Sequence, residues 1–273
     1  MNMKSNKEKN KWATIKFHVF EEVHLTFSIF AIALNFFLLY YMDQQGYLMA
    51  SRLVGYSNVA WAFTQFTWWT NILITLWFAI KKLVIRFNLS RFKFFNLFFN
   101  NNSYIYWVSY IAVVGTLFSV GSIYLILSQN VVKTPEGTAM IGNNIPQWLG
   151  TLRTLITLFV HFVNPVVYVF IFIYLLRNKI IDFNIKKSRK WWVFRRMIFG
   201  MIFPCIYFSF YVWFSLNKFD PYPISNMKKW EGMWILPVVI LSFFVSLFFF
   251  SHLTFHWKKQ VEKKKQEEKI VVK

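Results

Sequence analysis

The sequence contains little of what most soluble enzymes are built from. Only one of its 273 residues is a cysteine, and 11 are acidic. The single cysteine, Cys205, excludes an intramolecular disulfide. The chain also has no CxxC pair, Walker loop, GxGxxG fingerprint, HExxH helix or GxSxG elbow. It therefore lacks the usual signatures of metal, nucleotide and serine-nucleophile sites, and we expect no cofactor and no bound metal.

Charged residues are scarce, at 15%, whereas 56% of the residues are hydrophobic and 22% aromatic. Soluble domains have about 45–50% apolar and about 25% charged residues. The apolar residues form runs of roughly 20, the length that crosses about 30 Å of hydrocarbon as a helix. The pattern predicts an all-α polytopic membrane protein, a bundle of six transmembrane helices. The expected spans are 23–42, 58–80, 104–127, 150–176, 191–215 and 231–256, forming a domain 23–256 between a basic N-terminal segment 1–22 and a basic tail 257–273.

Lysine and arginine concentrate in four segments. The N-terminal segment, the connections after the second and fourth spans, and the C-terminal tail hold 25 of the 31 basic residues. Because cytoplasmic loops carry an excess of Lys and Arg, we expect both termini in the cytoplasm of a multi-pass cell-membrane protein. The net charge of +20 could indicate nucleic-acid binding. Charge spread beside membrane helices is better explained by anionic lipid headgroups, so we expect membrane lipids as partners and no nucleic acid.

Polar side chains interrupt the second span in the stretch TQFTWWTN, 64–71. It holds three threonines, a glutamine and an asparagine within eight positions. At about 100° per residue, Thr64, Thr67, Asn71 and Thr75 fall within about 80° of one another, with Thr70 at the edge. We therefore expect one polar face on this helix.

The fourth span has a matching stripe. The polar side chains that fall within about 80° of one another are Thr154, Thr157, His161, Asn164 and Tyr168. At about 1.5 Å per residue, Thr67 lies about 14 Å deep, Asn71 about 20 Å and His161 about 16 Å. The hydroxyl and the imidazole are thus predicted near mid-membrane, where an ionisable residue usually faces a bundle interior or a cavity.

A threonine and a histidine at one depth can form a nucleophile and its base. Neutral His161 can take a threonine proton and return it to a leaving group. Asn71 or Asn164 could bind a developing oxyanion or orient the imidazole. Pro165 leaves the His161 carbonyl without its helical donor, so we expect a bend there. Spacing alone also fits packing, because Thr, Asn and His often join membrane helices by hydrogen bonds.

Three short motifs carry a family resemblance. They are FTWWTNIL in the second span, HFVNPVVYVF in the fourth, and FPCIYFSFYVW followed by DPYP at the end of the fifth. They resemble the bacterial Pr-six-Pr family of six-helix integral membrane proteins, over nearly the whole chain. That family is distantly similar to the androgen-induced and androgen-dependent intramembrane threonine hydrolases. The resemblance implies a six-helix fold that cleaves lipid esters of the fatty-acid–hydroxy-fatty-acid type with a threonine and a histidine.

Carried over onto this sequence, the resemblance places the nucleophile in FTWWTN and the base at His161. In the hydrolases the threonine precedes an asparagine by three residues. Here that position is Trp68, so both Thr67 and Thr70 are candidates. Thr67 is favoured because it shares the helix face of Asn71. The resulting hypothesis is an intramembrane Thr/His hydrolase of lipid esters.

The expected substrate-binding residues are Asn71, Asn164, Arg153 and Tyr207. Arg153, at the outer end of the fourth span, could bind a substrate carboxylate or a lipid phosphate, although snorkelling to headgroups also explains it. Tyr207 would lie beside the DPYP turn, 220–223.

Other sites and functions fit the same pattern. An interfacial position explains His24, His252 and His256, although the last two have a spacing that can bind metal. The polar stripes could also line a non-enzymatic carrier or binding protein for a small or lipidic ligand, or join the helices of a membrane scaffold. The sequence shows no clear two-fold repeat, which argues against transport.

Overall fold

Long helices dominate the fold. The structure is a computed structural model that describes residues 3–46, 57–63, 65–99, 108–128, 131–134, 137–140, 146–177, 189–217 and 230–271. The helical elements are α1 (Met3–Gln44), α2 (Asn58–Phe63), α3 (Phe66–Arg86), the 3-10 turn η2 (Leu89–Arg91), α4 (Lys93–Phe99), α6 (Ser109–Ser128), α7 (Gln147–Leu158), the π-helical segment η4 (Phe159–Val163), α8 (Asn164–Arg177), α9 (Arg189–Asn217) and α10 (Trp230–Val271). A short antiparallel hairpin pairs β1 (Val131–Thr134) with β2 (Gly137–Met140). The predicted helical fold is confirmed, with this hairpin as an addition.

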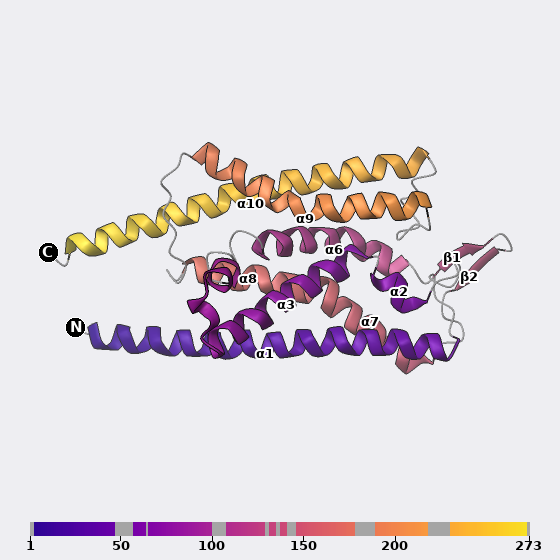
Figure 1. Cartoon of the computed structure of the whole chain (residues 1–273), viewed down its shortest axis with the longest axis horizontal. Helices are drawn as coiled ribbons and strands as arrows, with labels where there is room; N and C mark the ends of the chain where they lie inside the picture. Colours follow the sequence, from indigo (N-terminus) through magenta and orange to yellow (C-terminus); the bar gives the residue numbers. More distant parts are fainter. Residues whose placement is uncertain are drawn as a thin grey trace.

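The long helices lie side by side along one axis (Figure 1). α9 packs against α10, α6 packs against α8, and α3 lies between α1 and α6. The start of α1 and the end of α10 lie at one end of the molecule, and the β hairpin lies at the other.

Within the described residues, five helices are long and apolar enough to cross a membrane. They are Lys16–Gln44, Phe66–Arg86, Gln147–Leu175, Arg189–Asn217 and Leu236–Lys263, which correspond to the first, second, fourth, fifth and sixth predicted spans. At the third predicted span, 104–127, α6 is 20 residues long. Its first part, Ser109–Phe118, is a shorter apolar helix, and residues 104–107 lie outside the described ranges.

The second predicted span is not one continuous helix, so this part of the prediction is wrong. α2 ends at Phe63, and Gln65 is extended (φ −90°, ψ 133°) before α3 begins. The indole Nε1 of Trp69 donates to the Phe63 carbonyl over 2.6 Å. This bond satisfies a carbonyl that the end of a helix leaves without a donor. A side chain six residues away therefore holds the break, in a stretch without proline or glycine.

Phe66 lies at the centre of an aromatic core between α3, α6, α9 and α10. Its ring is fully buried and lies 4.9 Å from the ring of Tyr207, 5.1 Å from Phe118 and 5.6 Å from Phe243. Aromatic pairs in this range contribute about 0.5–1.5 kcal/mol each beyond the area that they bury. The core fixes the start of α3, and with it the position of the next residue, Thr67.

α9 approaches α6 and α10 closely at Gly200. A Cβ at this position would lie 2.9 Å from Cδ1 of Tyr110 and 3.0 Å from Cδ1 of Leu247. Small residues allow helices in apolar surroundings to approach to such distances. The glycine is therefore required by packing rather than by backbone conformation.

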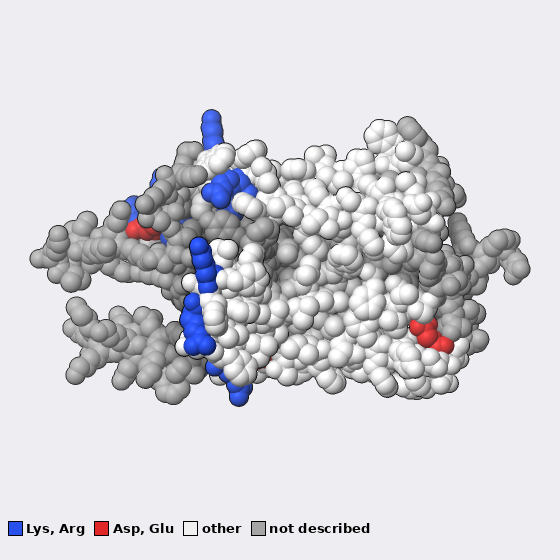
Figure 2. Space-filling model, in the orientation of Figure 1, with Lys and Arg blue, Asp and Glu red and all other residues white. Residues whose placement is uncertain are grey.

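Lysine and arginine side chains gather at one level of the molecule. On the face shown in Figure 2, the described Lys and Arg form a narrow band near the end that carries both termini. The described surface from this band to the far end shows neither residue. On this face, the fold thus has one basic end and, beside it, a long stretch of described surface without Lys or Arg.

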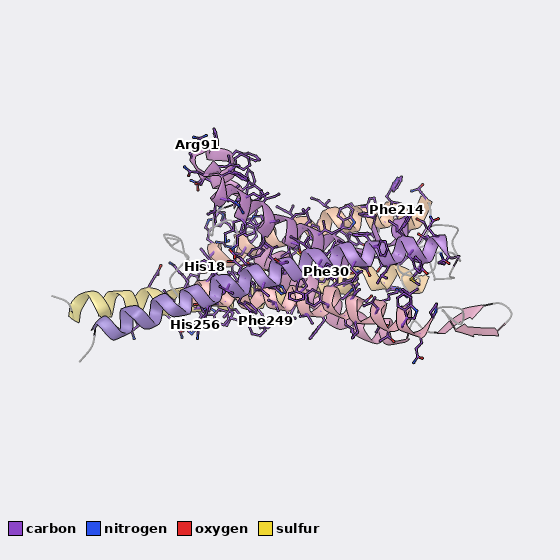
Figure 3. The ribbon with its side chains drawn as sticks, turned by 90° about the horizontal axis from the view of Figure 1, so that it is seen from below. His18, Phe30, Arg91, Phe214, Phe249 and His256 are labelled. Atoms are coloured by element: carbon purple, nitrogen blue, oxygen red, sulfur yellow. The ribbon has the colours of Figure 1, made fainter. Side chains whose placement is uncertain are left out.

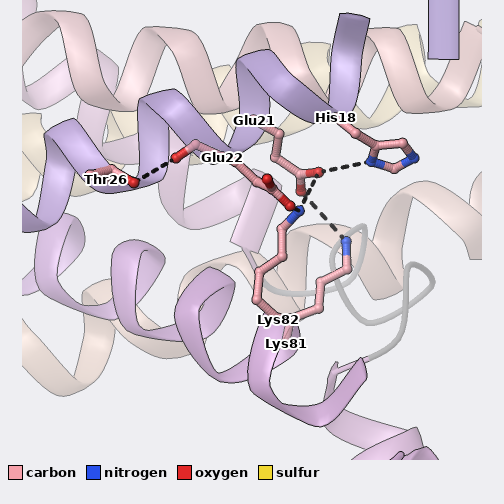
Figure 4. A network of polar contacts seen from close by, with 6 residues as sticks. All are labelled: His18, Glu21, Glu22, Thr26, Lys81 and Lys82. Atoms are coloured by element: carbon pink, nitrogen blue, oxygen red, sulfur yellow. Dashed lines mark hydrogen bonds and ion pairs between the residues drawn. The ribbon is translucent and has the colours of Figure 1, made fainter. Parts of the chain in front are cut away.

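A buried carboxylate lies at the basic end (Figure 4). Glu21 of α1 is 4% exposed, and its oxygens lie 3.4 Å from Nζ of Lys82, 3.8 Å from Nζ of Lys81 and 3.5 Å from Nδ1 of His18. Lys82 also pairs with the exposed Glu22 at 3.2 Å. The lysines belong to α3, so this network joins the end of α3 to α1. A carboxylate can be buried here because two cations accompany it.

Candidate functional site

A hydrogen bond joins Thr67 to His161. Thr67 Oγ1 lies 2.8 Å from Nε2 of His161, and both residues are buried. The other ring nitrogen, Nδ1, lies 2.9 Å from the carbonyl oxygen of Thr157. A carbonyl can only accept, so in the neutral ring Nδ1 carries the proton and Nε2 accepts. The Thr67 hydroxyl therefore donates to His161, as a nucleophile does to its base.

A widened helical turn carries His161. In the π-helical segment η4, the amide N–H of Asn164 bonds to the carbonyl of Phe159, five residues earlier. Pro165 follows and lacks the N–H that an α-helix would direct at the His161 carbonyl. The irregularity expected at Pro165 thus takes the form of a π turn. π turns are rare in proteins as a whole, and those that occur frequently lie at functional sites.

A second hydrogen bond between α3 and the helix that continues from η4 into α8 lies beside the bond between Thr67 and His161. Asn164 Nδ2 donates to Asn71 Oδ1 over 2.6 Å, and Asn71 Nδ2 donates to the Thr67 carbonyl over 2.6 Å. Both asparagines are fully buried. Each of these amides thus directs one N–H to an acceptor within the protein, and the pair links α8 to α3 beside the Thr67–His161 bond.

α1 contributes a polar row that we did not predict. Ser28 Oγ lies 2.6 Å from Asn164 Oδ1 and 2.8 Å from the carbonyl of His24. His24 is buried, with its ring 5.0 Å from that of Tyr168, so its side chain faces the interior of the bundle. A signal was present, because Glu21, His24 and Ser28 lie three and four residues apart on one face of an apolar span.

Thr70, the other candidate nucleophile, is placed differently. Its Oγ1 donates to the carbonyl of Thr67 over 2.8 Å. Its side chain packs against Gly115 of α6, where an added Cβ would lie 3.2 Å from Thr70 Oγ1. Thr70 thus occupies a packing position, and Thr67 is the threonine that the fold pairs with His161.

Arg153 lies on α7, eight residues before His161 and about 12 Å away along the helix axis. It is half-buried, and no hydrogen bond or ion pair joins it to the described residues. Its guanidinium is therefore a cation within reach of the site without an anionic partner in the described part of the chain.

The structure does not bring Tyr207 to the Thr67–His161 pair. Tyr207 is buried in the aromatic core against Phe66 and Trp69, on another face of α3. Thr154 is exposed, and its hydroxyl donates to the carbonyl of Gly150 over 2.9 Å. Thr64 and the DPYP turn, 220–223, lie outside the described residues.

No group of three or more His, Cys, Asp and Glu side chains that could hold a metal ion occurs in the described part of the chain. His252 Nδ1 accepts from Arg189, at 3.0 Å from Nε and 2.7 Å from Nη2. His256 Nε2 lies 2.9 Å from Nε2 of Gln260. Both histidines are thus engaged by neighbouring side chains.

Thr67 is the second residue of α3. The first backbone bonds of this helix run from Trp68 and Trp69 to the carbonyl of Gln65. The first N–H groups of a helix have no partner within it, and that end carries a partial positive charge. The break before α3 therefore places the Thr67 hydroxyl at a helix end that favours negative charge.

Comparison with known proteins does not extend these observations. No protein-family model matches the chain, and no curated protein or solved structure matches it. The resemblance to the Pr-six-Pr proteins and the intramembrane threonine hydrolases therefore stays a prediction, and the geometry around Thr67 and His161 carries the functional argument.

Proposed function

We propose that the chain crosses a cell membrane six times, with both termini in the cytoplasm. The five long apolar helices and the 20-residue α6 support six crossings. The band of Lys and Arg near both termini supports the orientation, because basic residues remain on the cytoplasmic side.

Within this bundle, the proposed function is hydrolysis of lipid esters by Thr67 and His161. The observation that carries it is the 2.8 Å bond from the Thr67 hydroxyl to Nε2 of His161. The Thr157 carbonyl supports the tautomer that accepts a proton at Nε2. A hydroxyl that already donates to an unprotonated base is prepared for nucleophilic attack.

The reaction would proceed in two steps. Thr67 Oγ1 forms a bond to the ester carbonyl carbon while His161 takes its proton, and the ester C–O bond breaks as His161 returns that proton to the departing alcohol. Water then attacks the acyl-threonine, gives a proton to His161, and the acid leaves as Thr67 regains its proton. The start of α3 supports the negative charge that develops on the carbonyl oxygen.

The surroundings support a lipidic substrate. Trp68 lies edge-on to the His161 ring, with centroids 6.3 Å apart. Phe162 and Val163, next to His161, are 39% and 40% exposed on the apolar outer surface. Arg153, two turns from His161, is the candidate for binding an acidic group of the substrate.

Fluorophosphonate labelling of the purified full-length protein tests this function. We expect a covalent adduct on wild type, its mass located on a peptide that contains Thr67, and no adduct on Thr67→Ala. Thr70→Ala is the matched control and should label normally, because its hydroxyl serves packing. A folded wild type without an adduct, or an adduct lost in Thr70→Ala only, would contradict the proposal and favour a lipid carrier or binding protein.

A further inference from the structure

The connection that follows α3 stands away from the bundle. The chain turns at Asn88, which is left-handed (φ 52°), passes η2 and returns as α4. Arg91 lies at the tip of this projection in Figure 3, to one side of the other helices. α4 contacts α3. We call residues 86–99 the lateral hairpin.

The lateral hairpin combines aromatic and basic side chains. Its sequence, RFNLSRFKFFNLFF, contains six phenylalanines, three basic residues and no acidic residue. Phe87, Phe94 and Leu97 are each 62% exposed, and Arg91 and Lys93 are exposed as well. An exposed apolar patch rimmed by charge marks an interaction surface.

Contacts with α3 fix which side of α4 faces outward. The indole Nε1 of Trp77 donates to the carbonyl of Phe98 over 2.8 Å, and the rings of Trp77 and Phe99 lie 6.3 Å apart. At about 100° per residue, Lys93 and Asn96 share a narrow polar side of α4. The exposed apolar side consists of Phe94, Leu97 and Phe98. α4 is thus a short amphipathic helix held in one orientation.

The hairpin also lies at a defined level of the fold. It begins at Arg86, about one helical turn after Lys81 and Lys82, whose network with Glu21 lies at the basic end. Trp77, to which α4 is bonded, lies nine residues before Arg86, about 14 Å back along α3. The hairpin therefore starts near the level of the basic band and returns away from the basic end.

We infer that the lateral hairpin lies in the interface of the membrane leaflet at the basic end and binds anionic phospholipid. Phe94, Leu97 and Phe98 enter the acyl region, and Arg91 and Lys93 contact the headgroups. Amphipathic segments with aromatic residues on one side and basic residues on the other occupy this layer. Without an acidic residue of its own, the hairpin complements a negatively charged leaflet. This surface is independent of the Thr67–His161 pair.

Spin-label accessibility in vesicles tests this placement. The full-length protein carries Cys205→Ser and a nitroxide on one new cysteine, either Phe94→Cys or, on the polar side of the same helix, Asn96→Cys. In vesicles of phosphatidylcholine and phosphatidylglycerol, we expect a severalfold higher ratio of oxygen to nickel-chelate collisions at position 94 than at 96. Leu241→Cys on the outer surface of α10 is the lipid-facing reference.

The role of anionic lipid is tested by removing either the lipid itself or the basic side chains of the hairpin. Vesicles of phosphatidylcholine alone, and the double variant Arg91→Gln/Lys93→Gln, should each lower the ratio at position 94 severalfold while position 241 is unchanged. Equally low ratios at 94 and 96, far below that at 241, would place the hairpin in water and overturn the inference. A ratio at 94 that neither change affects would overturn the recognition of anionic lipid.

Discussion

Asn164 donates to Asn71 across the boundary between α8 and α3, over 2.6 Å, within one turn of the bond between Thr67 and His161. The Asn71–Asn164 and Thr67–His161 hydrogen bonds thus lie side by side between α3 and the helix formed by η4 and α8. The amide pair holds the helices in the register that brings the hydroxyl to the imidazole, so its removal should disturb stability and site geometry together.

A double-mutant cycle measures the amide pair. Asn71→Ala and Asn164→Ala should each lower the free energy of unfolding in detergent. The loss in the double variant should be smaller than the sum of the two single losses by about 0.6–1.7 kcal/mol, values found for hydrogen bonds between membrane helices. As a control, Asn71→Ala is combined with Ser209→Ala, an exposed serine whose hydroxyl donates to its own helix at Cys205. That pair should be additive, and equal coupling in both cycles would contradict the role of the amide bond.

His161→Ala should slow fluorophosphonate labelling of Thr67 by about 10²–10⁴-fold, the usual contribution of a general base. The physical reason is that the Thr67 hydroxyl loses the acceptor at 2.8 Å. Thr157→Ala is the matched control, because His161 uses the Thr157 carbonyl rather than its side chain. Quenching the labelling reaction at successive times and quantifying the Thr67 adduct by mass spectrometry gives the rate for each variant. An unchanged rate in His161→Ala would exclude this histidine as the base.

Gly200→Ala should destabilise the bundle by about 1–3 kcal/mol, as overpacking does. The added Cβ would lie 2.9 Å from Tyr110 and 3.0 Å from Leu247. Gly150→Ala, on α7, has no atom within 4 Å of the added Cβ. It should be neutral or stabilise by up to about 1 kcal/mol, since alanine favours a helix. The temperature of thermal unfolding should therefore fall in Gly200→Ala and stay the same or rise in Gly150→Ala.

Glu21→Gln should lower stability by about 1–3 kcal/mol. This is less than the roughly 3–5 kcal/mol for a broken, fully buried pair, because the Lys82 side chain is 25% exposed and retains solvent. Glu22→Gln, one residue away and 66% exposed, should change stability by less than about 1 kcal/mol. Chemical unfolding of both variants distinguishes them, and equal losses would show that the burial of Glu21 does not matter.

The sequence predicted that Thr67 and His161 share a depth because two regularities act together. Helical periodicity places polar residues on one face, and the fixed rise per residue converts chain position into depth. Both are local properties of a helix, so they can be applied to each span separately. The pairing at 2.8 Å lies where these rules bring the two stripes together.

The remaining features depend on contacts between elements. The break after Phe63 depends on the indole of Trp69, and nothing in the local composition marks it. The polar row on α1 is visible as a pattern, but its partner Asn164 follows only from the order of helices in the bundle. The packing of Tyr207 against Phe66 likewise depends on contacts between helices, since periodicity gives the polar side of a helix but not the neighbour that it faces.

The interruption between α2 and α3 has a consequence for how this protein can change through mutation. In an unbroken helix, an insertion or deletion of one residue in the first turns would rotate every later residue by about 100°. Here Gln65 is extended and Trp69 closes the end of α2. The turn before the break can therefore gain or lose residues while the direction of Thr67 is preserved, and this end of the fold can diverge without displacing the Thr67–His161 pair.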